Sequence, residues 1–312
     1  MRFVSFVKKN IFGIIGAFVL TVFTVYALLD AFVIVRSYGA AQTAETTVQT
    51  EEGADTEAET SPEETAPSEP VVTSDSYTSD TVSVTLSEYR YLGTTIHVAD
   101  VTVSDPAKLL TAFADDTYGK NVKDETSSIA EDNGAVIAIN GDFYGSRNRG
   151  YVIRNGVLYR DDSAGNEDLV IWSDGTFGII DEDDVTAEEL LEQGAYQVFS
   201  FGPALIEDGS ITVSQYDEVG RSMASNPRTA IAVVDSCHYL FIVSDGRTSG
   251  EAGLSLYELA EFAQTLGVDT CYNLDGGGSS TMYFMGEVVN DPTGGRGSSS
   301  ERSVSDIVYV GE

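Results

Sequence analysis

Residues 229–275, TAIAVVDSCHYLFIVSDGRTSGEAGLSLYELAEFAQTLGVDTCYNLD, determine the predicted fold. Two apolar runs, 229–235 and 239–244, flank a short polar turn, which is typical of two successive strands. A capping box, SLYE, followed by apolar residues on one face, predicts a helix over 255–266. A further apolar run, 270–275, predicts another strand. A strand, a helix and a strand in this order predict a crossover connection, so that 239–244 and 270–275 run parallel.

The crossover places two aspartates together. Asp245 follows the first parallel strand and Asp275 ends the second, and parallel strands end at the edge where α/β proteins bind ligands. Alternating residues at 81–91 and 95–103 predict two half-buried strands, and Asp105 with the proline after it predicts a short helix. Together these signals predict a single domain of the α+β or mixed α/β class, with mixed β-sheets and a parallel strand–helix–strand crossover.

The N-terminal part of the chain predicts a membrane anchor over residues 11–35. Residues 11–29 carry no charge, and about 20 apolar residues are enough to span the hydrocarbon core. Arg2, Lys8 and Lys9 precede this segment, so the positive-inside bias predicts a cytoplasmic N-terminus. We expect a single-pass protein of the cell membrane whose C-terminal domain is extracellular. A cleaved signal peptide is the alternative.

Composition divides the chain into three parts. Residues 1–36 form the predicted cytoplasmic stub and transmembrane anchor. Residues 37–80 contain no Lys or Arg and are rich in Thr, Glu, Ser and Pro. This composition predicts a disordered acidic linker, because the segment has too little apolar surface to fold. Residues 81–312 form the predicted folded domain.

The chain is strongly acidic, with a formal net charge of −33 at pH 7. Such a charge repels nucleic acid, so no nucleic-acid partner is expected. An anionic substrate would need local positive charge. Arginine supplies it well, because its guanidinium binds phosphate or carboxylate in a bidentate manner. Arginines within sequence motifs are therefore the first candidates for substrate binding.

The chain contains 2 cysteines and 2 histidines. Cys237 and Cys271 lie at the N-terminal ends of the predicted parallel strands, where a disulfide and two buried thiols are both compatible with the sequence. His97 and His238 lie in unrelated contexts, as expected of ordinary strand residues. No G-x-S-x-G elbow supports a Ser-His-Asp hydrolase.

A glycine-rich loop, DGGGSST, follows at residues 275–281. It is not a P-loop, because no Gly-Lys-Ser/Thr follows the glycines. Glycines let backbone N–H groups approach a ligand closely, and the resulting nest suits an anion or a sugar hydroxyl. A turn that only requires positive φ is the alternative. The predicted substrate-binding residues of this loop are Gly276, Gly277, Gly278, Ser279, Ser280 and Thr281.

Three arginines lie next to the predicted strands. Arg228 precedes the first apolar run of the 229–275 stretch, Arg247 follows the second, and Arg302 precedes the last apolar run of the chain. Each could be an ordinary surface residue, but in so acidic a chain they predict a clamp for an anionic ligand. Asn140 ends another apolar run, AVIAIN (135–140), Asp142 follows it, and both are also predicted to contact substrate.

Five motifs, taken in order, resemble the phosphodiester glycosidase family. They are NGDFY (140–144), NPRTAIAV (226–233), SDGR (244–247), GLSLYELAEFAQTLGVDTCYNLDGGGSST (253–281) and ERSVSD (301–306). The resemblance covers most of residues 90–312. The best-known member of this family removes N-acetylglucosamine from a sugar phosphodiester. The resemblance therefore implies hydrolysis of a sugar-1-phosphodiester. With the predicted anchor, we expect an extracytoplasmic enzyme acting on a cell-wall or exopolysaccharide glycan.

The implied reaction suggests roles for the carboxylates. A phosphate leaving group needs no strong acid, but the reaction needs charge neutralisation and a carboxylate near the anomeric carbon. Asp245, Asp275 and Glu301 are the catalytic candidates, and the sequence leaves open which is acid, base or nucleophile. Oxygen ligands also suit Ca²⁺ or Mg²⁺. The alternative function is a non-catalytic glycan- or teichoic-acid-binding module, or an exopolysaccharide-assembly factor.

Overall fold

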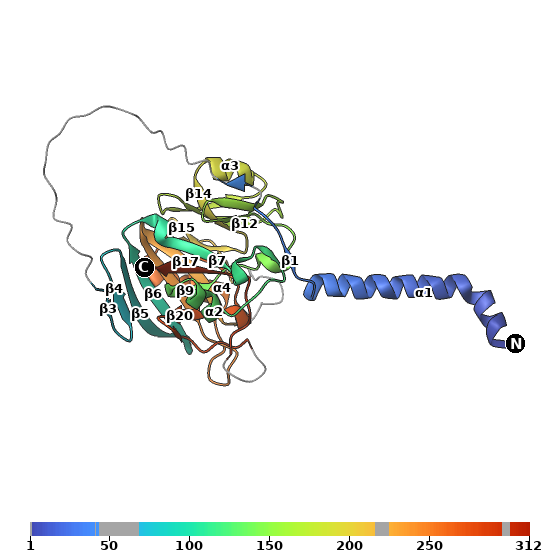
Figure 1. The fold of residues 1–312 in the computed structure, drawn as a ribbon. Coiled ribbons are helices and arrows are strands. Elements are labelled where there is room, and N and C mark those ends of the chain that lie inside the picture. Colours follow the sequence, from blue (N-terminus) through green and yellow to red (C-terminus); the bar gives the residue numbers. More distant parts are fainter. Residues whose placement is uncertain (1, 41, 44–68, 216–224, 295–299) are drawn as a thin grey trace, which may run out of the picture.

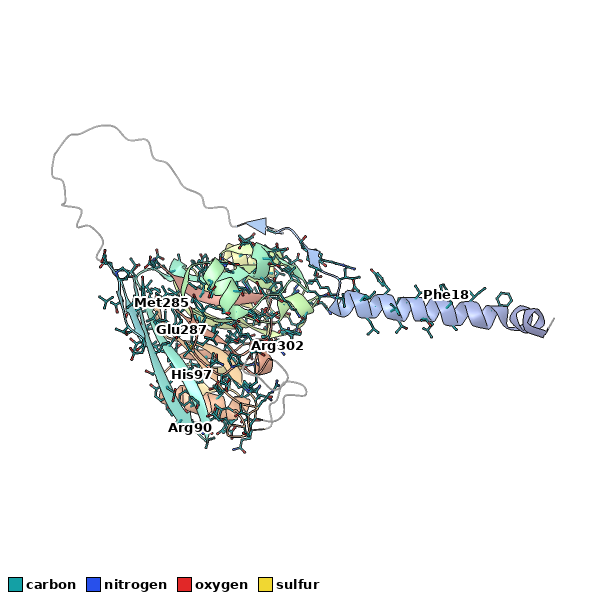
Figure 2. The ribbon with its side chains drawn as sticks, turned by 60° about the horizontal axis from the view of Figure 1, so that its bottom comes forward. Phe18, Arg90, His97, Met285, Glu287 and Arg302 are labelled. Atoms are coloured by element: carbon teal, nitrogen blue, oxygen red, sulfur yellow. The ribbon has the colours of Figure 1, made fainter. Side chains whose placement is uncertain are left out.

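The computed structural model describes residues 2–40, 42–43, 69–215, 225–294 and 300–312. A β-rich body forms most of the molecule, and helix α1 (Arg2–Phe32) projects from it with the N-terminus at the far end (Figure 1). Phe18, in the projecting part of α1, is 69% exposed (Figure 2). Within the described ranges, the strands form sheets of nine, six, five and two strands.

The nine-stranded sheet contains the strands that the sequence predicted within 229–275. In spatial order they are β16 (Ser210–Ile211), β15 (Ala204–Glu207), β19 (Thr270–Asn273), β17 (Arg228–Asp235), β18 (His238–Ser244), β6 (Thr94–Val103), β5 (Val82–Tyr91), β4 (Ser76–Thr78) and β3 (Val71–Val72). Helix α4 (Leu256–Thr265) packs on this sheet, because its Leu259 clusters with Ile242 of β18. The predicted capping box of Ser255 and Glu258 is confirmed.

The predicted parallel crossover is wrong. β17 lies between β18 and β19 and pairs with both in antiparallel orientation. Ile231 of β17 belongs to one hydrophobic cluster, and Ala230 and Ala232 belong to another. Because both faces of β17 are buried, it is a central strand that needs a partner on each edge. β18, the other strand of the hairpin, pairs with one edge of β17, and β19 pairs with the other edge. As both are antiparallel to β17, β18 and β19 still end on the same side of the sheet.

The five-stranded sheet packs against the nine-stranded sheet. Its strands, in spatial order, are β21 (Glu287–Val288), β20 (Met282–Phe284), β9 (Ala135–Asn140), β22 (Asp306–Gly311) and β7 (Leu109–Phe113). Ile137 and Val308 share a hydrophobic cluster with Val101 of β6, as expected of two sheets packed face to face. Helix α2 (Thr126–Asp132) covers the other face, where Ile129 clusters with Ala138.

The six-stranded sheet forms a further part of the body. Its strands, in spatial order, are β13 (Phe177–Asp181), β12 (Glu167–Trp172), β14 (Ala195–Phe199), β10 (Val152–Arg154), β11 (Val157–Arg160) and β2 (Gln42–Thr43). Helix α3 (Ala187–Glu192) packs on it through Leu190, which clusters with Val170. The remaining elements are the paired strands β1 (Arg36–Ser37) and β8 (Gly119–Lys120), and the 3₁₀-helices η1 (Pro106–Lys108), η2 (Ala114–Asp116), η3 (Tyr144–Ser146) and η4 (Gly277–Ser279).

The fold class is therefore mostly β rather than mixed α/β. Every pairing between the named strands of the described ranges is antiparallel, so the predicted mixed sheets are also wrong. Local predictions are confirmed: β5 and β6 match the strands expected at 81–91 and 95–103. Asp105 caps η1 by accepting a 2.9 Å hydrogen bond from the N–H of Ala107.

The predicted transmembrane anchor is wrong as well. Over the residues that the structure describes, no helix is both long and apolar enough to cross a membrane. This finding overturns the anchor predicted over residues 11–35. It also overturns the single-pass cell-membrane localisation, with its cytoplasmic N-terminus and extracellular domain.

Both ends of the predicted linker, 37–80, are paired with the body. β1 pairs with β8 and β2 pairs with β11, while β3 and β4 extend the nine-stranded sheet beside β5. Residues 44–68 of this predicted linker lie outside the described ranges.

Both cysteines are free thiols. Cys237 lies in the turn between β17 and β18, whereas Cys271 of β19 pairs with Ala232 of β17. The disulfide alternative is therefore not formed, because β17 separates the two strands that were expected to be neighbours. Burial raises the pKa of the Cys271 thiol to about 12.

Candidate functional site

Two adjoining cavities open where β19 ends and β17 begins. The larger has a volume of about 360 Å³, and its walls include Lys123, Asp142 and Phe143. The smaller has a volume of about 130 Å³, and Arg228 and Arg247 line it. Asp275 and Arg302 line both cavities. These two residues therefore stand where the cavities meet.

Asp275 and Arg302 form an ion pair. Oδ2 of Asp275 accepts hydrogen bonds from Nη2 of Arg302 and from Oγ of Ser279, each 2.7 Å long. Nε of Arg302 also donates to Ser279 Oγ at 2.8 Å. Burial raises the pKa of Asp275 above its ordinary value, and Arg302 and Ser279 oppose that rise. The result is a positioned carboxylate with increased basicity.

Asn140 holds the backbone that carries Asp275. Its Nδ2 donates a 2.6 Å hydrogen bond to the carbonyl oxygen of Asp275. Its Oδ1 accepts from Thr229 Oγ1 at 2.8 Å and from the N–H of Thr281 at 3.3 Å. Asn140 and Thr281 are both fully buried. The structure thus gives these two predicted substrate-binding residues partners within the protein, in positions that support Asp275.

The predicted arginine clamp gathers at the smaller cavity. Nε of Arg228 donates to the carbonyl oxygen of Leu254, and Nε of Arg247 donates to Oδ1 of Asn226, both at 2.9 Å. Both arginines line this cavity together with Arg302. Arg228, Arg247 and Arg302 therefore line one cavity in a chain of net charge −33.

The glycines of the 275–281 loop leave room for neighbouring side chains, and the loop's N–H groups are mostly bonded within the protein. The N–H of Gly277 donates to the carbonyl of Pro227, and those of Ser279 and Ser280 donate within the loop to Gly276 and Gly277. These three N–H groups are therefore engaged, and the arginines supply the positive charge. A Cβ on Gly277 would lie 2.8 Å from Nη2 of Arg247, and the φ of Gly277 is +65°.

Close packing also explains why position 278 is a glycine. A Cβ on Gly278 would lie 3.0 Å from Cα of Gly294. Of the loop's predicted binding residues, Ser279 lines the larger cavity, and Gly276 and Gly277 line the smaller one. Ser280 is buried beside them.

Asp245 lies away from both cavities. Its Oδ2 is 3.2 Å from Nε2 of His97, and its Oδ1 accepts a 2.9 Å hydrogen bond from the N–H of Asp291 (Figure 2 labels His97). Burial would raise the pKa of Asp245, but the bonds from His97, Asp291 and Asn290 more than offset it, so the pKa is lowered. Asp245 is therefore a carboxylate that ties a strand end to a loop.

Glu301 binds the start of helix α2. Its Oε2 accepts a 3.0 Å hydrogen bond from the N–H of Ser127, and its other oxygen accepts from the Ser127 hydroxyl. A carboxylate stabilises a helix N-terminus in this way. Of the three predicted catalytic carboxylates, Asp275 is the one that lines the cavities, so the structure does not bring Asp245 and Glu301 to it.

Asp142 lines the larger cavity but is held by a buried ion pair. Its Oδ2 accepts a 2.9 Å hydrogen bond from Nη2 of Arg154, whose Nε donates to Oδ2 of Asp306 at the same distance. Asp142 also accepts from the N–H of Tyr144 at 2.8 Å. These bonds fix the segment that carries Phe143 in the cavity wall.

Several lining residues were not predicted as site residues. Lys123 and Phe143 line the larger cavity, while Phe201, Asn226 and Asn273 line the smaller one. The aromatic pair after Asp142 was a sequence signal for Phe143. Lys123 lies in the stretch NVKDE, which matches no motif. Only the fold brings it beside Asp275 and Arg302.

The predicted Ca²⁺ or Mg²⁺ remains a prediction. Within the described ranges, no group of three or more His, Cys, Asp or Glu side chains is placed to hold a metal ion. Each candidate carboxylate is bound instead by protein donors, as described above for Asp142, Asp245, Asp275 and Glu301.

Two solved structures of other proteins have a fold similar to that of this chain. The zebrafish N-acetylglucosamine-1-phosphodiester alpha-N-acetylglucosaminidase catalytic domain, auto-inhibited by its pro-peptide, has a similar fold: TM-score 0.58 and 20% identity, over 74% of this chain and 83% of that one. A hypothetical protein from Synechocystis matches with a TM-score of 0.57 and 17% identity, over 74% of this chain and 62% of that one. At these identities the likeness shows the fold alone.

A sequence relative is known from Bacillus subtilis. The SPbeta prophage-derived uncharacterized protein YomE is 29% identical over 199 residues, which is 62% of this chain and 30% of YomE. The chain thus spans about a third of the length of this relative. The family model for phosphodiester glycosidases matches residues 133–311, more than half of the chain, and this range includes Asp275 and the three arginines. The protein therefore belongs to the phosphodiester glycosidase family.

Proposed function

We propose that this protein hydrolyses sugar-1-phosphodiesters in a cell-wall or exopolysaccharide glycan. The observation that carries the proposal is the position of the Asp275–Arg302 ion pair between two cavities of different character. Three arginines line the smaller cavity, and of these Arg302 alone also lines the larger one, which has Phe143 in its wall. This asymmetry suits a substrate with a phosphate at one end and a sugar at the other.

The phosphodiester is assigned to the smaller cavity. Guanidinium groups bind phosphate oxygens through charge-assisted, often bidentate hydrogen bonds. As the glycosidic bond breaks, negative charge grows on the phosphate oxygen that leaves, and Arg228, Arg247 and Arg302 are placed to stabilise it. Because the leaving phosphate is already weakly basic, the reaction needs no strong general acid there.

The sugar is assigned to the larger cavity, with its anomeric carbon near Asp275. The bond from C1 to the phosphate oxygen breaks, and its electron pair leaves with the phosphate. Asp275 either takes a proton from the attacking water or attacks C1 itself before water completes hydrolysis. Both routes yield a free sugar and a phosphomonoester. NMR of the anomer formed first distinguishes them, because the first route inverts and the second retains configuration.

The test is turnover by the full chain on a panel of sugar-1-phosphodiesters and phosphodiester-linked cell-wall polymers, followed by mass spectrometry. The proposal predicts release of a free sugar together with a phosphomonoester from at least one member. Binding of these compounds without release of sugar would favour a non-catalytic glycan-binding module. Neither binding nor release by any member would contradict a glycosyl-phosphate ligand altogether.

A further inference from the structure

We infer that Lys123 forms a second anion subsite in the larger cavity, so that the preferred substrate carries another acidic group on its sugar or on the neighbouring unit. This inference rests on the proposed function for the identity of the ligand. It adds a substrate class: glycosyl phosphodiesters with a second phosphate or a carboxylate, such as repeating phosphodiester-linked or acidic glycans. Lys123 is distinct from the three arginines that were predicted to bind the anionic ligand.

The backbone around Lys123 is fixed on both sides. The N–H of Asn121 donates to the carbonyl of Gly145 at 3.0 Å. Asp124 and Val304 exchange two backbone hydrogen bonds, of 3.0 and 2.7 Å. Because the backbone is held at Asn121 and at Asp124, Lys123 is carried at a defined place in the wall of the cavity that also contains Asp275 and Arg302.

The ammonium group of Lys123 is held over an aromatic ring. Its Nζ lies 5.6 Å from the centre of the Phe143 ring and donates a 2.7 Å hydrogen bond to Oγ of Ser146. A cation over an aromatic face is stabilised without being neutralised. Ser146 is also a neutral acceptor. These contacts orient the ammonium and leave it able to bind an anion.

The carboxylates of this cavity are already paired with other cations. Asp142 is bound by Arg154 at 2.9 Å, and Asp275 is bound by Arg302 at 2.7 Å. Across the described residues, Lys123 forms no ion pair. Among the charged residues that line this cavity, Lys123 is therefore the cation without a carboxylate partner, since Arg302 is bound to Asp275.

The surroundings of Lys123 favour an incoming anion. Lys123 is exposed, but its partial desolvation in the cavity wall and the nearby charge of Arg302 lower its pKa, and Asp275 opposes this only in part. A bound phosphate or carboxylate would restore the stability of the charged ammonium. Lysine presents a compact single charge, whereas the arginines of the smaller cavity present planar forks. One acidic group on the sugar side fits this geometry.

The test uses Lys123→Met, which keeps the stem that packs on Phe143, and Lys123→Arg, which keeps the charge. Lys108→Met is the matched control, because Lys108 ends η1 and lines neither cavity. Substrates are a neutral glycosyl phosphodiester and matched compounds with a phosphate or a carboxylate on the sugar. The parent should prefer one acidic compound about tenfold in kcat/KM, as expected of one charge-assisted hydrogen bond. Lys123→Met should remove that preference and Lys123→Arg should retain it, whereas Lys108→Met should change the rate on each compound by less than about twofold.

Titration calorimetry with the same compounds separates this inference from the proposed function. A parent that binds the acidic compound more tightly than Lys123→Met does, without hydrolysing it, would support the subsite and contradict the glycosidase. A parent that hydrolyses the neutral and acidic compounds equally well would support the glycosidase and overturn the subsite. Equal losses for both compounds in Lys123→Met would also overturn it, since they indicate a structural role. Absence of any binding or turnover would overturn both.

Discussion

Nη2 of Arg302 lies 2.7 Å from Oδ2 of Asp275, and the two side chains differ sharply in exposure, at 43% and 13% respectively. The carbonyl oxygen of Asp275 is bound by Asn140 at 2.6 Å, so the carboxylate is supported from the protein side. Arg302 reaches it from the solvent side. A substrate phosphate can thus bind Arg302 while Asp275 keeps its place.

The pH dependence of activity should report this ion pair. Burial raises the pKa of Asp275, and Arg302 opposes the rise. Arg302→Met should therefore raise the pKa of Asp275 further. Because an ionised Asp275 is required, activity is lost as pH falls through this pKa, and the acid limb of kcat/KM should move to higher pH in the variant. A pH–rate profile checks this against Arg90→Met, a residue that lines neither cavity. An unmoved acid limb would contradict the role of Asp275.

The arginines of the smaller cavity should not tolerate lysine. Arg228→Lys and Arg247→Lys should each weaken transition-state binding by about 1.5–3 kcal/mol, because a bidentate charge-assisted contact is lost. The measurement is kcat/KM on a glycosyl phosphodiester, together with thermal unfolding to detect any loss of fold. Arg90→Lys, at the exposed end of β5, is the matched control. Unchanged kcat/KM and affinity in both variants would exclude an anion clamp.

Activity should require glycine at position 277 but not at position 209, because only at 277 would a side chain collide with Arg247. Both have positive φ, +65° and +69°, but a Cβ meets Arg247 at Gly277 and nothing within 4 Å at Gly209. Valine at either position should cost about 1–3 kcal/mol of stability through backbone strain. Only Gly277→Val should also inactivate, because it displaces Arg247. Thermal unfolding and turnover of the two variants test this, and equal activity in both would refute the steric role.

Asp245 should contribute to stability and not to chemistry. Its folded-state pKa is lowered, so its stabilising effect is present above the ordinary Asp pKa of about 3.9 and is lost as pH falls through the folded-state value. Asp245→Asn should lower the free energy of unfolding by about 1–3 kcal/mol at pH 7. The difference should shrink in acid. Denaturant titrations at several pH values measure it, and an inactive variant of full stability would assign Asp245 to catalysis.

Local sequence signals predicted the local structure correctly. The capping box of α4, the cap at Asp105 and the alternation in β5 and β6 each depend on residues close in sequence. The order of strands does not. The hairpin of β17 and β18 has two outer edges that can pair with a further strand. The sequence does not say whether β19 pairs with β17 or with β18. The predicted parallel crossover failed at this point.

The site was predicted in part, for a related reason. Motifs identified Asp275, Arg228, Arg247 and Arg302, which the fold brings to the two cavities. Motifs do not give the direction of a side chain, so Glu301 and Asp245 were equal candidates although they bind Ser127 and His97. Lys123 belongs to no motif, and its place depends on backbone bonds to distant residues.

The most direct test of the central claim compares the full chain with Asp275→Asn on a glycosyl phosphodiester that the parent accepts. Release of free sugar and phosphomonoester is followed by mass spectrometry, and thermal unfolding confirms that both proteins are folded. The parent should release both products, and the variant should be slower by about a thousandfold or more while still binding the substrate. A folded Asp275→Asn variant that retains the full rate would contradict the account.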